Sequence, residues 1–144
     1  INQIFVDDED YPNKAQWCNE NGCYIEEIEP NEDGTRQFQI KKHPDPTPEE
    51  QMEQLKSSII NAVQNVLDST VQARGYDNGF ACASYSYSSD ETFKREAEAF
   101  IIWRDKTWRY CYDLLDKFLA GEIEQPTVDS VLQSMPKIDW KDGE

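Results

Sequence analysis

The segment His43-Pro44-Asp45-Pro46-Thr47-Pro48 constrains the fold of this chain more than any other feature. A proline fixes its own φ and has no amide proton, so this density of prolines fits neither a sheet nor a helix interior. We therefore expect a stiff elbow at residues 44–48 that separates two structures. The same residues predict a helix start, because Thr47 can cap, Pro48 suits the first helical position and Glu50 completes a capping box.

Residues 1–43 have the pattern of a small antiparallel β region. Residues 24–28 are strand-like, and residues 36–41 alternate apolar and polar side chains with a period of two. Asp33-Gly34 lies between these runs and tolerates the positive φ of a tight turn, so the two runs predict a hairpin. Two smaller elements are expected before it: a third strand at residues 4–6 and a short helical turn at residues 14–20.

Residues 49–144 have the apolar period of helices. The first helix is expected to run from the elbow to about Ala73. The second is expected to open at Ser88 or Asp90 and to close at Gly121. The remaining segments are a loop at residues 76–89, a short third helix that starts at Pro126-Thr127 and ends at Pro136, and a tail that packs through Ile138 and Trp140.

The predicted fold class is therefore α+β. A small β-rich head with an antiparallel hairpin occupies residues 1–43, and the Pro-rich elbow occupies residues 44–48. A helical domain of two long helices and one short helix occupies residues 49–144. Two long amphipathic helices and a short one can bury their apolar stripes against each other as a small bundle.

The net charge of −15 restricts the possible partners of this chain more than any other feature of its composition. Nucleic-acid affinity comes largely from Lys and Arg that displace counterions from phosphates, so an excess of carboxylates disfavours nucleic acid. It also disfavours anionic membranes, and no apolar run approaches the roughly 18 to 20 residues of a spanning helix. The charge suits a basic or apolar protein partner.

The start of the chain is unlike a secretory signal peptide, because Ile1–Val6 is followed at once by acidic residues. We therefore expect folding in the cytoplasm, where cysteines remain free thiols. Cys18 and Cys23 are spaced loosely for zinc, and no second pair follows them. Cys82 and Cys111 stand alone in the sequence, so no metal site and no disulfide framework is predicted.

A search of the sequence for catalytic groups finds none with a workable arrangement. The single histidine, His43, lies among the prolines, and no phosphate-binding loop, nucleophile elbow or metalloprotease helix is present. Carboxylate pairs such as Glu26 and Glu27 lie in polar runs, whereas a catalytic pair needs burial to separate its pKa values. The acidic run Asp7–Asp10 lacks the Gly and the distal Glu of a calcium loop. The sequence therefore predicts a protein without enzymatic activity or a cofactor.

The segment from residue 103 to residue 112 combines aromatic and basic side chains, which often anchor protein interfaces. Trp108 and Tyr112 share a helix face and are expected in the core. Trp103 and Tyr110 point elsewhere and are expected to contact a partner or the other domain. The residues predicted to bind a partner, here and in the hairpin and loop, are Trp17, Tyr24, Phe38, Ile40, Tyr76, Phe80, Tyr85, Tyr87, Trp103 and Tyr110.

Two sets of residues form a familiar arrangement. The N-terminal set is Tyr11-Pro12, Trp17-Cys18-Asn19, Gly22, Ile25-Glu26-Glu27-Ile28, Asp33-Gly34 and Phe38-Gln39-Ile40. The C-terminal set is Arg74-Gly75-Tyr76-Asp77, Cys82-Ala83-Ser84-Tyr85, Glu96-Ala97, Ala99-Phe100, Trp103-Arg104-Asp105, Trp108, Pro136 and Trp140. The first resembles small proteins encoded beside tail-fibre genes of tailed bacteriophages, and the second is similar to a recurrent phage domain. The plan of head, elbow and helices is similar to that of tail-fibre assembly proteins.

The resemblance implies a non-enzymatic assembly chaperone that binds a phage tail or tail-fibre protein in the host cytoplasm. Such a chaperone would shield the strand edges and apolar tips that unassembled fibre chains expose. The same families include virion parts, so a structural tail or baseplate protein retained in the virion is the alternative. A second alternative, which rests on charge, is an acidic nucleic-acid mimic that inhibits a host protein. The sequence is also compatible with association of the chain with itself.

Overall fold

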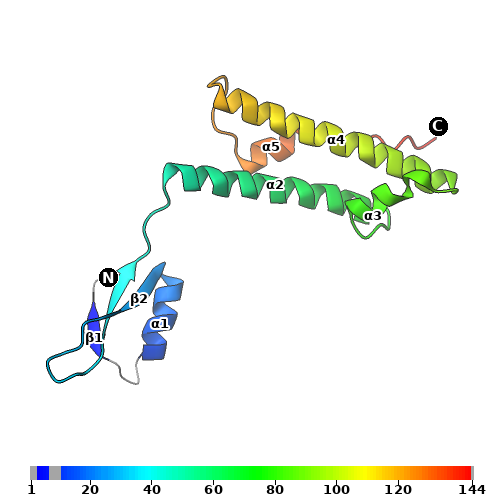
Figure 1. The fold of residues 1–144 in the computed structure, drawn as a ribbon. Coiled ribbons are helices and arrows are strands. Elements are labelled where there is room, and N and C mark those ends of the chain that lie inside the picture. Colours follow the sequence, from blue (N-terminus) through cyan, green and yellow to red (C-terminus); the bar gives the residue numbers. More distant parts are fainter. Residues whose placement is uncertain (1–2, 7–10, 144) are drawn as a thin grey trace. The chain divides into compact units, whose positions relative to one another are not determined.

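A computed structural model of the chain describes residues 3–6 and 11–143. The chain divides into two compact units, residues 1–47 and 48–144, and the division falls inside the predicted elbow. The acidic run at residues 7–10, compared above with a calcium loop, lies outside the described residues. The fold class is α+β, as predicted, with a small antiparallel sheet in the first unit and helices in the second (Figure 1).

Unit 1 contains the predicted hairpin. Within the described residues its sheet has three antiparallel strands in the order β1-β3-β2, so the predicted third strand is confirmed. The helix that precedes the hairpin begins earlier than the predicted turn and runs for ten residues. The elements of unit 1 are β1 (Ile4–Val6), α1 (Tyr11–Glu20), β2 (Cys23–Ile28) and β3 (Gln37–Lys42).

The strand register decides which side chains of β3 are buried. Phe38 lies opposite Phe5 of β1, and Ile40 lies opposite Ile25 of β2. Because side chains alternate across a strand, both residues point to the same face, where they are buried with Cys18 and other apolar side chains. The prediction that Phe38 and Ile40 bind a partner is therefore wrong: they form the core of unit 1.

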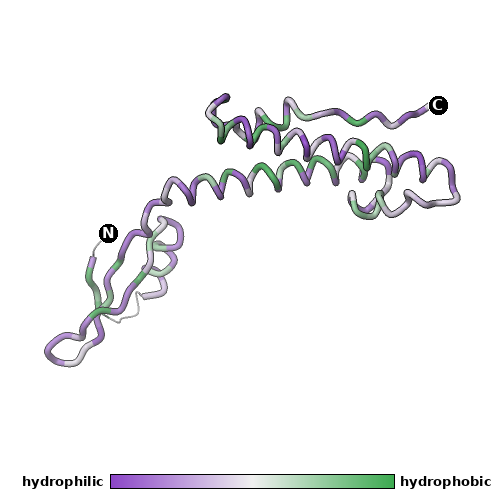
Figure 2. The backbone as a smooth tube through the Cα atoms, turned by 45° about the horizontal axis from the view of Figure 1, so that its top comes forward, coloured by the Kyte–Doolittle hydropathy of each residue, from purple (hydrophilic) through white to green (hydrophobic). Residues whose placement is uncertain are grey.

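Unit 2 is helical. Its elements are α2 (Pro48–Gln72), α3 (Gly79–Ser84), the 3₁₀ helix η1 (Tyr85–Tyr87), α4 (Glu91–Leu119) and α5 (Val128–Ser134). The two long helices α2 and α4 run side by side in opposite directions, and α5 lies at the end where α2 begins and α4 finishes (Figure 1). Apolar positions recur along α2 with polar positions between them, as the sequence period predicts (Figure 2).

The helix boundaries follow the predicted signals closely. α2 begins at Pro48 and stops three residues before Gly75, whose φ is 97°. Asp90 caps α4, because its carboxylate accepts the backbone N–H groups of Thr92 and Phe93 at 3.0 Å. Gly121, with a φ of 75°, follows the end of α4 as expected.

Residues 76–89 do not form the predicted loop, because α3 and η1 occupy most of them. Asn78 caps α3, since its side-chain oxygen accepts the backbone N–H of Ala81 at 2.8 Å. The Gly79 N–H donates to Asp68 of α2 at 2.8 Å, which ties the start of α3 to the long helix. The small residues that suggested a loop allow this helix to lie close to its neighbours instead.

The core of unit 2 lies mainly in the C-terminal half of α2 and the N-terminal half of α4. Trp103 belongs to it, because only 4% of its surface is exposed and its indole N–H donates to the Pro136 carbonyl at 2.7 Å. The predicted partner contact of Trp103 is therefore wrong. Tyr110 is partly buried against the same core, and the tail packs through Ile138 and Trp140 as predicted. The buried apolar residues are Val63, Leu67, Val71, Cys82, Phe100, Trp103, Val131 and Met135.

The tail is also held by Arg74. Its guanidinium stacks on the Trp140 ring at 4.4 Å from the centroid and donates to both carboxylate oxygens of Asp142, at 3.1 and 2.5 Å. It also donates to the buried carboxylate of Glu96 at 3.3 Å. Arg74 therefore joins the end of α2, helix α4 and the tail. Its hydrogen bond holds the pKa of Asp142 below the usual range.

We expect strong acid to release this tail. Because the pKa of Asp142 is lower in the folded chain, the contact stabilises folding above the unfolded value of about 3.9 and is lost as pH falls through the lower folded value. The indole N–H signal of Trp140 in an NMR titration should stay constant from neutral pH to about 4 and shift below it. Asp142→Asn should remove most of that acid transition, and the control Glu122→Gln, at an exposed carboxylate outside the tail, should preserve it. An unchanged transition in Asp142→Asn would assign the titration to another group.

Candidate functional site

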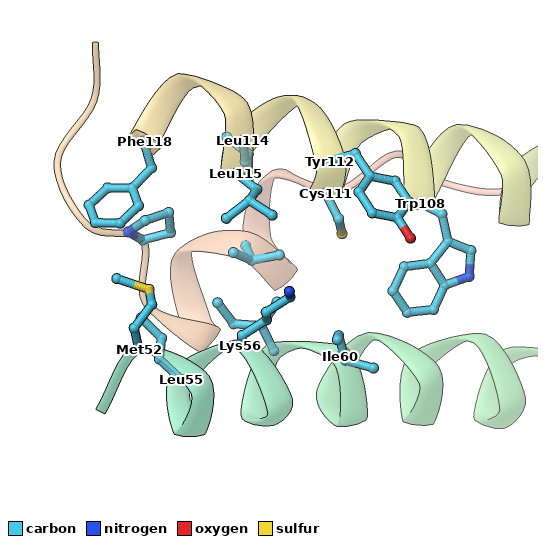
Figure 3. Close-up of a pocket in the computed structure, with 13 residues that line it drawn as sticks. Met52, Leu55, Lys56, Ile60, Trp108, Cys111, Tyr112, Leu114, Leu115 and Phe118 are labelled. Atoms are coloured by element: carbon cyan, nitrogen blue, oxygen red, sulfur yellow. The ribbon is translucent and has the colours of Figure 1, made fainter. Parts of the chain in front are cut away.

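The most distinctive surface of unit 2 is an apolar groove of about 560 Å³ between the N-terminal half of α2 and the C-terminal half of α4. Met52, Leu55 and Ile60 extend from α2 towards side chains of α4 that include Leu115 and Phe118 (Figure 3). α5 and the residue Pro126 close one side. We use "apolar groove" for Met52, Leu55, Lys56, Ile59, Ile60, Trp108, Cys111, Tyr112, Leu114, Leu115, Phe118, Pro126 and Val131.

The groove lies at one end of the two long helices, because their fully buried side chains gather at the other end. There α3 contacts both α2 and α4, and the buried side chains of both helices gather between them. Towards the groove, no side chain of α2 residues 48–62 or of α4 residues 108–119 is fully buried in the described structure. Within the described residues of unit 2, the apolar stripes of both helices continue past the residues that cover them.

Several groove residues are exposed to a degree unusual for their type. Tyr112 is 61% exposed and Ile60 is 44% exposed, although both lie on helix faces that look like core in the sequence. Trp108 is half-buried at the edge of the groove. The expectation that Tyr112 enters the core is therefore wrong, and Trp108 enters it only in part. This contiguous apolar surface makes the groove a candidate site of interaction.

The groove offers few polar groups for chemistry. Lys56 contributes an ammonium group and Tyr112 a hydroxyl (Figure 3). The thiol of Cys111 also lies in the groove, and burial raises its pKa. A higher pKa means less thiolate, so Cys111 is a poor nucleophile. This lining suits the binding of an apolar surface and lacks an acid–base or nucleophile–base pair.

The opposite end of unit 2 carries an exposed aromatic surface on α3 and η1. Phe80 is 88% exposed and Tyr87 is 97% exposed, so both remain candidates for partner contact. Tyr85 is partly exposed and lies between the rings of Tyr76 and Phe93, with centroids 5.5 and 5.4 Å away. Tyr76 is half-buried there, and burial together with the Glu96 carboxylate raises its pKa to about 12.

Unit 1 presents fewer apolar residues. Trp17 on α1 and Tyr24 on β2 are partly exposed, and the Tyr24 ring lies 4.9 Å from that of His43. Two carboxylates of β2 form ion pairs: Arg36 donates to Glu27 at 2.9 Å, and Lys41 pairs with Glu26. Of the four residues predicted to bind in unit 1, only Trp17 and Tyr24 are available at the surface.

No catalytic or metal-binding arrangement stands out in the part of the chain that the structure describes. Among residues 3–6 and 11–143, no three His, Cys, Asp or Glu side chains gather as a metal site. Cys18, Cys23 and Cys82 are buried. The pKa of Cys82 is raised to about 11, mainly by burial and to a smaller extent by the negative charge of Glu96. None of the helices in these residues has the length and apolarity needed to cross a membrane.

Comparison with protein families, curated proteins and solved structures found no match to this chain. The site is therefore interpreted from its own geometry. Sequence reasoning missed the groove because its residues share the helical period of the core, and periodicity does not show whether a stripe is covered. One signal was available: the stripes of the two long helices are longer than a seven-residue third helix can cover.

Proposed function

We propose that this chain is a non-enzymatic protein-binding protein that acts as an assembly chaperone for a phage tail or tail-fibre protein in the host cytoplasm. The observation that carries the binding role is the apolar groove, whose side chains are exposed without a covering element of unit 2. The phage assignment is supported by the sequence resemblance in both units. The charge of −15 keeps a chain with such a surface in solution.

The proposal fits the physical problem of fibre assembly. An unassembled fibre chain exposes strand edges and apolar segments that aggregate. A chaperone must cover such a segment and then release it, which favours a preformed apolar surface of moderate size. The groove provides one, and the aromatic residues Phe80 and Tyr87 provide a second apolar surface on the same unit.

Co-expression tests this function. We expect the chain to raise the yield of soluble trimer severalfold when it is produced with the tail-fibre protein encoded beside it, as measured by sizing chromatography. Ile60→Ser should remove most of the gain, because Ile60 lies in the groove and is exposed. Ile102→Ser is the matched control, since Ile102 is 54% exposed on α4 and lies outside the groove.

Two outcomes would count against the proposal. An unchanged trimer yield, with no complex on the column, would rule out a chaperone of that fibre. Stoichiometric amounts of the chain in purified particles, detected by mass spectrometry, would make it a virion component instead.

A further inference from the structure

The segments that form the groove carry an excess of acidic residues, and Lys56 is the one charged residue among the described residues that line the groove itself. Residues 48–60 and 108–131 contain eight acidic and three basic residues, so they carry −5 of the −8 net charge of unit 2. Glu49 and Glu53 are exposed on α2 beside Met52, and Asp116 is exposed on α4 one turn from Tyr112. An apolar surface with such a border complements an apolar surface bordered by Lys and Arg.

The walls of the groove restrict the conformation of what can bind there. The backbone N–H and C=O groups of a helix interior bond within the helix, so α2 and α4 offer an incoming chain no backbone partners. An extended peptide would bury unpaired backbone groups against the apolar lining, at a large cost in free energy. A helix satisfies its own backbone and therefore avoids this cost.

The length of the groove agrees with a short helix. From Met52 to Ile60 the α2 wall rises about 12 Å, and from Trp108 to Phe118 the α4 wall rises about 15 Å. These lengths match two to three turns, which present apolar anchors at positions i, i+3 or i+4, and i+7. With α2, α4 and α5 as three walls, the added helix would complete a four-helix arrangement.

We propose that the apolar groove binds a basic amphipathic helix of the partner protein. This inference rests on the proposed function, since it names the kind of segment that the chaperone holds. The Lys and Arg of that helix lie against Glu49, Glu53 and Asp116, and its apolar face covers Ile60, Trp108 and Tyr112. A second copy of this chain is a poorer occupant, because it would bring its own acidic border against this one.

Three labelled peptides of about 18 residues test the inference with the full chain, a length at which an isolated helix can form in part. The first has Leu at helical spacing and Lys elsewhere, the second has Glu in place of Lys, and the third has the Lys and Leu residues scrambled. Fluorescence anisotropy should show tight binding of the first only, with affinity falling as salt rises. Bound peptide should also slow alkylation of Cys111, which lies in the groove.

Matched variants locate the binding. Ile60→Ser should weaken binding of the basic peptide about tenfold, as expected for a central anchor, and Ile102→Ser should leave it unchanged. The charge pair Glu49→Gln with Glu53→Gln should weaken it severalfold and reduce the salt dependence. Glu91→Gln with Glu98→Gln removes the same charge from the other end of unit 2, on exposed positions of α4, and should have little effect.

The outcomes separate this inference from the proposed function. Equal binding of the acidic or scrambled peptide, or an Ile60→Ser variant that binds like the parent chain, overturns the inference. A dimer in sedimentation that Ile60→Ser dissociates would assign the groove to a second copy and also overturn it. If the basic helix does not bind but Ile60 is still needed for fibre rescue, the inference fails alone. If the helix binds through Ile60 and no fibre is rescued, the proposed function fails alone.

Discussion

Replacing Phe100 with Ala should lower the free energy of unfolding of unit 2 by about 3 to 5 kcal/mol. The Phe100 ring is buried at 1% exposure and meets the Trp103 ring edge-on, with centroids 6.2 Å apart. It also contacts Gly79 at the start of α3, so its removal opens a cavity where three elements meet. Since a domain of this size is stable by only about 5 to 15 kcal/mol, much of the stability would be lost.

Urea unfolding followed by tryptophan fluorescence measures this change, because three of the four tryptophans lie in unit 2. The control is Phe80→Ala, which makes the same substitution at an exposed ring of α3 and should change stability by less than about 0.5 kcal/mol. Equal losses for both variants would show that Phe100 is not at the centre of the core.

The second large effect is expected from Gly79→Ala. A Cβ at this position would lie 2.6 Å from the Cζ atom of Phe100 and 3.2 Å from the Oδ1 atom of Asp68. The ring must move or α3 must shift, and overpacking of this kind costs about 1 to 3 kcal/mol. The same movement strains the hydrogen bond from the Gly79 N–H to Asp68, which fixes the start of α3.

A double-mutant cycle tests the cause of that loss. In a Phe100→Leu background the end of the ring is absent, so the penalty of Gly79→Ala should become clearly smaller than in the parent chain. The measurement is again urea unfolding of the four proteins. The same penalty in both backgrounds would mean that the contact with Phe100 is not the source of the strain.

Local chemistry in the sequence was enough to place most helices and strands. Proline geometry located the elbow and the start of α2, and Asp90 and Gly121 marked the ends of α4 because capping needs only neighbouring residues. The loop prediction at residues 76–89 failed for a tertiary reason. A six-residue helix has little stability of its own, and α3 forms where Asp68 and Phe100 of the long helices hold it.

The candidate site could not be predicted in the same way. Trp103 and Tyr112 lie on the same helix with similar neighbours in sequence, yet one is buried and the other is 61% exposed. The difference depends on what lies opposite each side chain. Trp103 faces the tail, where the Pro136 carbonyl accepts a hydrogen bond from its indole N–H, whereas Tyr112 lines the groove.

The sequence by itself determined that the chain is acidic, that a Pro-rich segment separates two parts, and that no recognisable catalytic motif is present. These properties depend on composition and on interactions between near neighbours along the chain. Only the tertiary structure decided that Phe38, Ile40 and Trp103 are core residues and that Ile60 and Tyr112 line a groove. An apolar stripe looks the same in sequence whether it is covered or not, because its burial depends on residues far away in the chain.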